Sequence, residues 1–362
     1  MFCGKLAAII KLLMIVERPV RTMKEIDSFN LILAGIALLT QLIIGQTNAQ
    51  DANSLEPVAA PIPPGLETVE FYSPAVDRRM KFDIVLPEGY YLGDARYPVL
   101  YLLHGYMQNY TVWGRNLAAA FYARELDDLI VVLPDAGNSW FINYASSTQG
   151  QTNNWEDYIV NDVIGQVDKR YRTEPRREAR AIAGLSMGGF GAYSIGLRHS
   201  ELFISIGSTS GALGHARTAA AAIRAGANRT SAPTDPQRQA RIDEADAFIS
   251  KIIDVQGFST QGERTPKGVD FATAEQAEAY DPFAIIYEVP RSQMPHIYMD
   301  SGTEDRLVQV AREMAQLLML NNVPFDYMQD HGTHNSEYWR RSIGHMMTIQ
   351  NEVMQRALGK RP

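Results

Sequence analysis

The chain has 362 residues, with 34 Lys or Arg against 41 Asp or Glu and a formal net charge of −7. This length suits one large α/β domain with a sizeable core, or two small domains. The acidic balance and the lack of a basic block argue against a nucleic-acid partner. The one cysteine, Cys3, excludes an internal disulfide, a cysteine nucleophile in the mature domain and a thiolate metal cluster.

Residues 1–50 have the features of an N-terminal extension with an export signal. Residues 31–44 form an apolar run of signal-peptide length, and Thr47 and Ala49 stand at positions −3 and −1 of a cleavage site. We predict export to the periplasm or the medium, with cleavage near Ala49. Retention as a membrane anchor is the alternative, and Met23 is an alternative start of the chain.

The mature chain begins with a linker and then enters one predicted α/β-hydrolase domain. Residues 51–65 are rich in Ala and Pro and indicate the linker, whereas the domain covers 66–358. Within it, 66–73 and 80–86 predict an antiparallel strand pair at the edge of the sheet. The continuous apolar run 97–103 predicts a strand that is buried on both faces.

Strands and helices then alternate, which predicts a mostly parallel central sheet with helices on both faces. Helices are expected at 113–129, 155–171, 308–321 and 336–358, and strands at 129–133, 179–185, 203–207, 295–300 and 323–328. Residues 213–280 interrupt this alternation. We interpret them as an inserted helical segment or lid, with disorder as the alternative.

The sequence Gly184-Leu185-Ser186-Met187-Gly188 fits the G-x-S-x-G pattern of a nucleophile elbow. In this turn the chain reverses sharply from a strand to a helix, so the flanking positions need residues without a side chain. The pattern predicts that Ser186 is a nucleophile, exposed at the carboxyl end of the sheet. A glycine-rich turn that carries a bystander serine is the structural alternative.

A serine hydroxyl needs an adjacent base, and the chain order of this arrangement is Ser, then Asp or Glu, then His. His331 and His334 lie in the loop after the last predicted strand, where the carboxyl edge of the sheet would present them to Ser186. We favour His334, because it directly precedes the final helix. A loop histidine that bonds to backbone is the alternative for either residue.

The acid is expected in the loop after the preceding strand, which offers three carboxylates. We favour Asp305, because it lies beyond a glycine turn and could bend back toward the histidine. It would then fix the imidazole tautomer and stabilise the imidazolium. Asp300 is the second choice and is expected to cap the turn, and Glu304 is the third.

Acyl transfer also needs hydrogen-bond donors for the oxyanion. We expect one from the backbone N–H of Met187, the residue after the nucleophile, and one from the backbone N–H of Tyr106. The nearby His104 is interpreted as a brace of the loop rather than a base. In the aromatic-rich loop at 136–154, Trp140 and Phe141 either line an acyl or sugar site or pack inside the protein.

Taken together, these residues resemble the esterase D family of α/β-hydrolases. This family includes S-formylglutathione hydrolases, tributyrin esterases, feruloyl esterase modules and mycolyltransferases. The resemblance extends over 66–357 and is carried by the segments 101–105, 139–141, 155–160, 167–173, 184–189, 302–305 and 332–334, the last followed by Tyr338-Trp339. It implies an α/β-hydrolase fold, with Ser186 as nucleophile, Asp305 as acid and His334 as base, and Tyr106 and Met187 as oxyanion donors.

We therefore predict an exported serine carboxylesterase that hydrolyses short-chain acyl, acetyl or feruloyl esters, on small molecules or saccharides. The alternatives are an acyltransferase that uses a sugar hydroxyl, a thioesterase like S-formylglutathione hydrolase, and a non-catalytic scaffold. The sequence has no cluster of metal ligands and no phosphate-binding loop, so we expect neither a metal nor a cofactor. Membrane contact is expected only through an uncleaved N-terminal segment.

Overall fold

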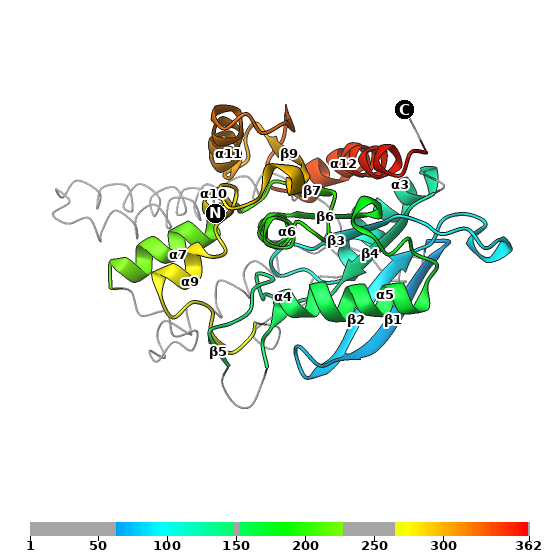
Figure 1. Cartoon of the computed structure of the whole chain (residues 1–362), viewed down its shortest axis with the longest axis horizontal. Coiled ribbons are helices and arrows are strands. Elements are labelled where there is room, and N and C mark those ends of the chain that lie inside the picture. The colour runs from blue at the N-terminus through cyan, green and yellow to red at the C-terminus, as the bar shows by residue number, and fades with distance from the viewer. Residues whose placement is uncertain (1–62, 127, 148–151, 227–264, 361–362) are drawn as a thin grey trace, which may run out of the picture. The chain divides into compact units, whose positions relative to one another are not determined.

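The computed structural model describes residues 63–126, 128–147, 152–226 and 265–360 (Figure 1). The chain divides into two units, Met1–Ala59 and Ala60–Pro362, and every described residue belongs to the second. The predicted export signal therefore lies outside the described residues, as does most of the predicted linker. Within the described ranges, no helix combines the length and the apolar character needed to cross a membrane.

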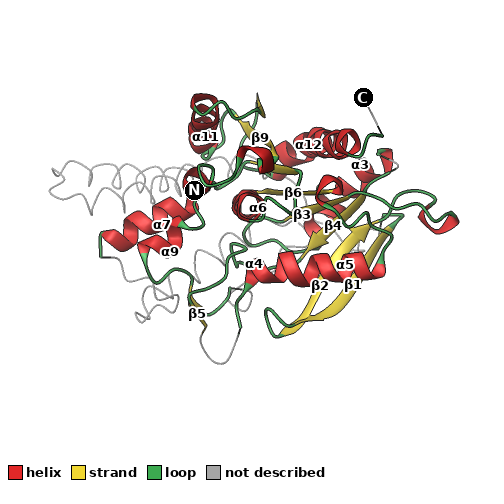
Figure 2. Ribbon diagram, in the orientation of Figure 1, coloured by secondary structure: helices red, strands yellow, loops and turns green. Residues whose placement is uncertain are grey.

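In the described part of the second unit, an eight-stranded sheet forms the centre (Figure 2). Its spatial order is β1-β2-β4-β3-β6-β7-β9-β10. The strands are β1 (Leu66–Ser73), β2 (Arg78–Val85), β3 (Val99–Leu103), β4 (Ile130–Pro134), β6 (Arg180–Leu185), β7 (Ser205–Thr209), β9 (His296–Gly302) and β10 (Phe325–Asp330). β2 pairs antiparallel with β1 and β4, and the strands from β4 to β10 are parallel. The predicted edge pair and mostly parallel sheet are confirmed.

Helices cover both faces of the sheet, as predicted. One face carries α4 (Trp155–Asp157), η3 (Tyr158–Val163), α5 (Ile164–Arg170), α6 (Met187–Arg198) and α11 (Val308–Leu320), and the other carries α3 (Ala119–Glu125) and α12 (Ser336–Ala357). Successive strand residues point to opposite faces, so Tyr101 and Ile182 pack into the first core and Leu100 and Ala181 into the second. Figure 1 shows α5 and α12 on opposite sides of the sheet.

The prediction of one continuous helix over 113–129 is wrong, because the structure has two separate helical elements there. A π-helical turn, η2 (Val112–Asn116), comes first, and α3 follows. Ala118 between them has φ 63°, a left-handed conformation that cannot continue a right-handed helix. β7 also begins and ends two residues later than the predicted strand, at Ser205 and Thr209.

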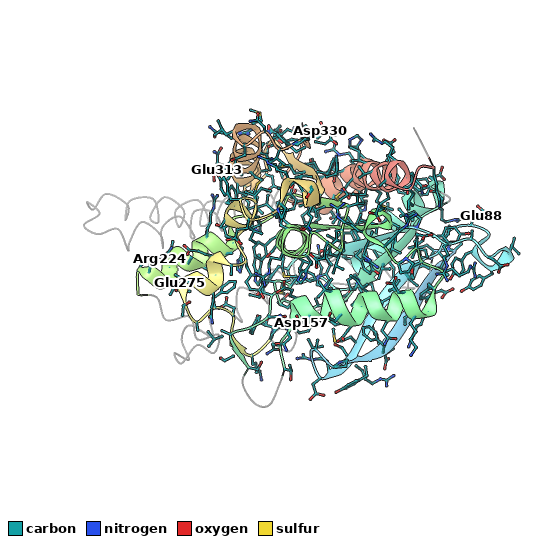
Figure 3. All side chains as sticks on the ribbon, in the orientation of Figure 1. Glu88, Asp157, Arg224, Glu275, Glu313 and Asp330 are labelled. Carbon is teal, nitrogen blue, oxygen red and sulfur yellow. The ribbon has the colours of Figure 1, made fainter. Side chains whose placement is uncertain are left out.

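Part of the predicted insertion at 213–280 is described. It contains α7 (His215–Arg224), the short strand β8 (Gly268–Val269) and α9 (Ala274–Glu278), whereas 227–264 lie outside the described residues. The two helices pack together, and Arg224 pairs with Glu278 at 2.5 Å. Figure 3 labels Arg224 and the neighbouring Glu275 where α7 and α9 meet.

The described part of this segment packs against the loop that follows β4. β8 pairs antiparallel with β5 (Ser146–Ser147) of that loop. A small apolar core joins Ile142 of the loop and Phe190 of α6 to Phe271 and Tyr280. The chain then passes through α10 (Pro282–Ile285) into β9. Two segments more than a hundred residues apart in the sequence thus form one wall beside the sheet.

Candidate active site

Ser186 occupies the sharp turn between β6 and α6. Every residue of β6 is buried, and the helix starts at Met187, directly after the serine. Ser186 itself has φ 51° and ψ −113°, a conformation that residues other than glycine seldom adopt. Such strain is typical of a nucleophile elbow. The backbone carbonyl of Thr209 accepts the Ser186 N–H at 3.1 Å and helps to hold the turn.

Two glycines permit this turn, because the chain passes too close to itself for any side chain. A Cβ on Gly184 would lie 2.4 Å from the carbonyl carbon of Gly188, and a Cβ on Gly188 would lie 2.4 Å from the carbonyl oxygen of Leu103 in β3. Both distances are far below van der Waals contact. The glycines of the sequence pattern therefore bring the start of α6 against β6 and β3.

The structure brings Ser186, His334 and Asp305 into one chain of hydrogen bonds. The Oγ of Ser186 lies 3.1 Å from Nε2 of His334. On the other side of the ring, Nδ1 lies 2.9 Å from Oδ2 and 3.2 Å from Oδ1 of Asp305. An ionised carboxylate only accepts, so Nδ1 carries the proton and Nε2 is free to accept the serine proton.

Asp305 is almost fully buried, with an exposed fraction of 2%. Burial by itself would raise the pKa of its carboxyl. The hydrogen bond and the charge of His334, with a further bond from the Leu307 backbone N–H at 2.8 Å, lower the pKa below its usual value instead. Asp305 therefore stays ionised at neutral pH and can stabilise a protonated ring at His334.

Glycines also bring the loops of the acid and the base together. A Cβ on Gly302, at the end of β9, would lie 2.1 Å from the carbonyl oxygen of Gly332 in the loop after β10. Gly332 has φ 151°, and a Cβ there would meet the ring of Tyr338 at 2.7 Å. Asn335 caps α12 by accepting the Tyr338 N–H, which fixes the chain directly after His334.

The second and third choices for the acid do not touch His334 in the structure. Asp300 lies inside β9, so the expectation that it caps a turn is wrong. Its carboxylate accepts the hydroxyls of Thr209, Tyr298 and Tyr338. Burial raises its pKa to about 6, although these three hydrogen bonds act in the opposite direction. Glu304 bonds instead to the exposed His331 at 3.2 Å.

The loop after β3 holds Tyr106 at the same edge of the sheet as Ser186. The interpretation of His104 as a brace of this loop is confirmed: its Nδ1 donates to the Gly105 carbonyl at 2.8 Å, and its Nε2 accepts the Ala136 N–H at 3.0 Å. β3 pairs with β6, so the loop lies beside the elbow. Met187 is the first residue of α6, and its N–H is among those that have no intrahelical acceptor.

Trp140 and Phe141, the two candidates for substrate binding in the loop after β4, differ in their surroundings. Trp140 and Phe141 have φ 59° and 58°, unusual values for bulky residues. Phe141 has no exposed surface and packs so closely on Gly191 that a Cβ there would lie 2.7 Å from its ring. This favours packing inside the protein. Trp140 is half-buried, with its ring centre 6.0 Å from that of Tyr106.

Two further residues at this site were not predicted from the sequence. The ring of His215, the first residue of α7, stacks on Trp140 with centres 3.5 Å apart and planes 6° apart. Asn138 bonds to Met107, the residue after Tyr106. Both contacts join segments that are distant in the chain and follow no motif, so no local pattern could have predicted them.

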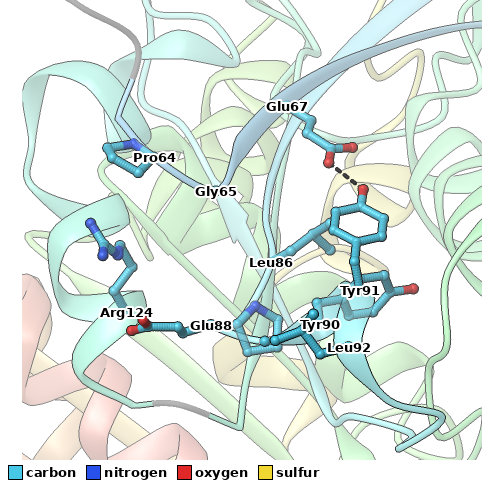
Figure 4. A pocket seen from close by; sticks show the side chains of 11 residues that line it. Pro64, Gly65, Glu67, Leu86, Glu88, Tyr90, Tyr91, Leu92 and Arg124 are labelled. Carbon is cyan, nitrogen blue, oxygen red and sulfur yellow. Dashed lines mark hydrogen bonds between the residues drawn. The ribbon is translucent and has the colours of Figure 1, made fainter.

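A cavity of about 400 Å³ lies away from Ser186, and Figure 4 shows it at close range. Leu86, Tyr90 and Arg124 are among its lining residues. The end of β2 pairs with the start of β4, so this cavity lies at the amino edge of the parallel strands, opposite Ser186. Among the residues that the structure describes, no group of three or more His, Cys, Asp or Glu side chains could hold a metal ion.

Known proteins resemble this chain in sequence. A sequence model of the family described as "Putative esterase" matches residues 73–348. An acetyl esterase of Caldicellulosiruptor saccharolyticus is 24% identical over 70% of this chain and 83% of its own length. An esterase of Mycobacterium tuberculosis is 32% identical over 41% of this chain, and the match spans only 32% of that protein's length.

Among solved structures, the chain resembles FphF, the fluorophosphonate-binding serine hydrolase F of Staphylococcus aureus, with a TM-score of 0.59 and 20% identity. The match covers 79% of this chain and 97% of FphF. At this identity the likeness shows the fold, which is the α/β-hydrolase fold. The family match confirms the resemblance that was drawn from the sequence.

Proposed function

Because the chain belongs to the esterase family whose model it matches, a family of carboxylic ester hydrolases, we propose that it is a serine carboxylesterase with Ser186 as its nucleophile. The observation that supports this most strongly is the continuous hydrogen bonding from Ser186 through His334 to Asp305. The strained backbone at Ser186 and the burial of Asp305 add to it. Hydroxyl, imidazole and carboxylate in this order are the parts of a Ser-His-Asp triad.

In the proposed first half-reaction, Ser186 Oγ attacks the ester carbonyl carbon while His334 Nε2 takes the hydroxyl proton. The carbonyl oxygen becomes an oxyanion, and the backbone N–H groups of Met187 and Tyr106 are the proposed donors that stabilise it. When the tetrahedral intermediate collapses, the bond to the alcohol breaks and His334 gives its proton to the leaving oxygen. The acyl group stays on Ser186.

In the second half-reaction, a water molecule attacks the acyl-enzyme. His334 takes a proton from the water and returns it to Ser186 Oγ as the carboxylic acid leaves. Asp305 keeps the ring in the tautomer that has its proton on Nδ1, and its charge stabilises the imidazolium in both halves. A sugar hydroxyl in place of the water would give acyl transfer instead of hydrolysis.

We propose short-chain acyl, acetyl or feruloyl esters as substrates, on small molecules or saccharides. The acetyl activity named for the C. saccharolyticus relative, which matches most of this chain, supports the acetyl group. The half-buried Trp140 beside Tyr106 offers an aromatic surface for a larger acyl group. A panel of p-nitrophenyl and sugar esters with different acyl groups would rank these substrates, and product analysis with and without a saccharide acceptor would separate hydrolysis from transfer.

The central test is the Ser186→Ala variant, assayed with p-nitrophenyl acetate and with a fluorophosphonate probe. We expect hydrolysis and labelling in the wild type, both lost in the variant, with circular dichroism unchanged. The remaining rate over water should be small, because the attacking atom is gone. Full activity in Ser186→Ala, or a wild-type protein that neither hydrolyses esters nor takes up the probe, would contradict the proposal.

We also propose that the protein is exported and cleaved after Ala49. The apolar run at 31–44 and the small or polar residues at Thr47 and Ala49 support this. When the full chain is expressed in a bacterium, the proposal predicts a periplasmic or secreted product that begins at Gln50. A full-length product recovered from the membrane fraction would instead support the anchor alternative.

A further inference from the structure

The buried side chain of Asn138 connects the loop after β3 to the segment before β8. Its Oδ1 accepts the backbone N–H of Met107 at 2.8 Å, and its Nδ2 donates to Thr265 Oγ1 at 3.0 Å. Its exposed fraction is 3%. We infer that Asn138, supported by Thr265, is a positioning residue that fixes the direction of the Tyr106 N–H. This inference rests on the proposed function, in which that N–H stabilises the oxyanion.

The backbone on both sides of Tyr106 is held in place. A peptide group is planar, so fixing the Gly105 carbonyl also fixes the direction of the Tyr106 N–H. His104 Nδ1 and the Gln108 N–H both donate to that carbonyl, at 2.8 and 3.2 Å. Asn138 holds the next peptide group through Met107. The loop after β4 thus provides the contact that stops the second peptide group from turning.

The conformation of Met107 shows why such a contact is needed. Met107 has φ 66°, a left-handed value that is unfavourable for a long side chain. Its N–H is buried, and without an acceptor it would remain unsatisfied, which is unfavourable for a polar group away from water. Loss of the Asn138 amide therefore favours a backbone rearrangement at Met107, and the adjoining Tyr106 peptide would move with it.

Thr265 supports the amide from the other side. The Met107 N–H can only donate, so Oδ1 of Asn138 must face it and Nδ2 must find another acceptor. Thr265 Oγ1 is that acceptor, and the Met107 sulfur lies farther away, at 3.7 Å. A buried amide with both ends bonded keeps one orientation. This contact links the described end of the predicted insertion to the loop that carries Tyr106.

Asn153 provides a matched control. It is also fully buried, and its Nδ2 also donates to the segment near β8, at the Lys267 carbonyl, over 2.9 Å. Its Oδ1, however, accepts from Arg78 at the start of β2 rather than from the loop after β3. Replacing Asn153 by Ala therefore removes a comparable pair of hydrogen bonds without touching the backbone around Tyr106.

The test compares Asn138→Ala with Asn153→Ala in the full chain, well below the melting temperature of either. We expect both to lower the Tm, but only Asn138→Ala to lower kcat for p-nitrophenyl acetate, by about 10- to 100-fold with KM within about twofold. Its labelling rate by a fluorophosphonate should fall in parallel. Equal kcat values for the two variants would overturn the inference.

Thr265 gives a second, milder test that remains available if Asn138→Ala fails to fold. Thr265→Val keeps the shape but removes the acceptor, so kcat should fall by a few-fold, whereas Thr265→Ser should restore the wild-type value. The same kcat in the Val and Ser variants would also count against the inference. All these outcomes leave the proposed function intact, because the wild type still hydrolyses ester and is still labelled at Ser186.

Discussion

The hydroxyl of Tyr280 donates a hydrogen bond to Oε2 of Glu156 over 2.6 Å, and both side chains are buried. Arg198 Nε and His199 Nε2, at the end of α6, donate to the other carboxylate oxygen at 2.7 and 2.8 Å. One carboxylate thus joins three parts of the fold: α4, the helix that follows the nucleophile, and the segment between α9 and α10.

This carboxylate should make stability depend on pH. Burial would raise the pKa of Glu156, but the hydrogen bonds of His199 and Arg198 lower it to about 2. The pKa of Glu156 is thus lower in the folded protein than in the unfolded chain, where it is about 4.3. The ionised carboxylate therefore stabilises the folded protein at pH values above about 4.3, and this stabilisation is lost as the pH falls toward 2. We expect Glu156→Gln to cost about 3 kcal/mol in free energy of unfolding at pH 7.

Urea unfolding at several pH values measures this cost. The difference between the wild type and Glu156→Gln should shrink as the pH falls from 5 to 3, because Glu156 of the unfolded wild type takes up a proton in this range while Glu156 of the folded protein stays ionised. Glu278→Gln, which alters an exposed ion pair with Arg224, is the control and should show little dependence on pH. A difference that stays constant over this range would contradict the assignment.

Replacing Asp305 by Asn should chiefly lower kcat, whereas replacing Asp300 by Asn should chiefly lower the Tm. Asp305→Asn leaves an amide where His334 needs an acceptor that fixes its tautomer, so kcat should fall by about 10³- to 10⁴-fold with little change in KM. Asp300→Asn disturbs three buried hydroxyls, so it should lower the Tm while kcat falls less than about tenfold. If Asp300→Asn abolished activity and Asp305→Asn did not, the acid would be misassigned.

The two histidines of the loop after β10 should also differ. His334→Ala removes the base that contacts Ser186, and kcat should fall by about four orders of magnitude or more. His331 is exposed and bonds to Glu304, so His331→Ala should keep nearly the wild-type kcat and Tm. Steady-state kinetics of both purified variants decide the matter, and comparable losses in the two would contradict the assignment of the base.

Gly188 should not tolerate even the smallest side chain. Alanine normally favours a helix, but at Gly188 its Cβ would lie 2.4 Å from the Leu103 carbonyl oxygen. We expect Gly188→Ala to destabilise the protein by about 1–3 kcal/mol and to lower kcat, because the elbow must shift. Gly165 in α5 has open space around it, so Gly165→Ala should instead stabilise by about 0.5–1 kcal/mol. Thermal melts and kinetics of both variants would test this.

Alanine substitutions at Trp140 and Phe141 should have different effects, one on substrate binding and the other on stability. Phe141→Ala should destabilise by about 3–5 kcal/mol, because it empties a site in the core. Trp140→Ala should keep most of the stability but raise KM for an aromatic acyl ester more than for an acetyl ester. KM values for p-nitrophenyl acetate and a feruloyl ester measure the contrast. An equal change for both substrates would remove Trp140 from the proposed binding surface.

The fold and the central contact could be predicted because their signals are local or follow from sheet order. Buried apolar runs predicted the parallel strands, and the glycines around Ser186 predicted the elbow. The carboxyl ends of parallel strands share one edge, so the loops after β9 and β10 were expected beside Ser186. That expectation was enough to bring Asp305 and His334 together with it.

Other features depend on contacts that no local pattern encodes. β9 continues to Gly302, so Asp300 meets hydroxyls from β7 and α12 instead of capping a turn. Trp140 and Phe141 themselves adopt consecutive left-handed backbone conformations, which set the directions of their side chains. The sequence does not predict these conformations. Asn138 lies in a polar loop, and no sequence pattern distinguishes it from the other loop residues. Only the structure shows its hydrogen bonds to Met107 and Thr265.

Among the strands that the structure describes, β10 at the end of the sheet pairs with β9 alone, and most of its residues are exposed. The loop that follows it supplies His334, whereas Ser186 follows an interior strand. Local fraying at this border would withdraw the imidazole while the centre of the protein remained intact. On heating, catalysis should therefore fail at a lower temperature than the cooperative melt, and cooling from that interval should restore it in full.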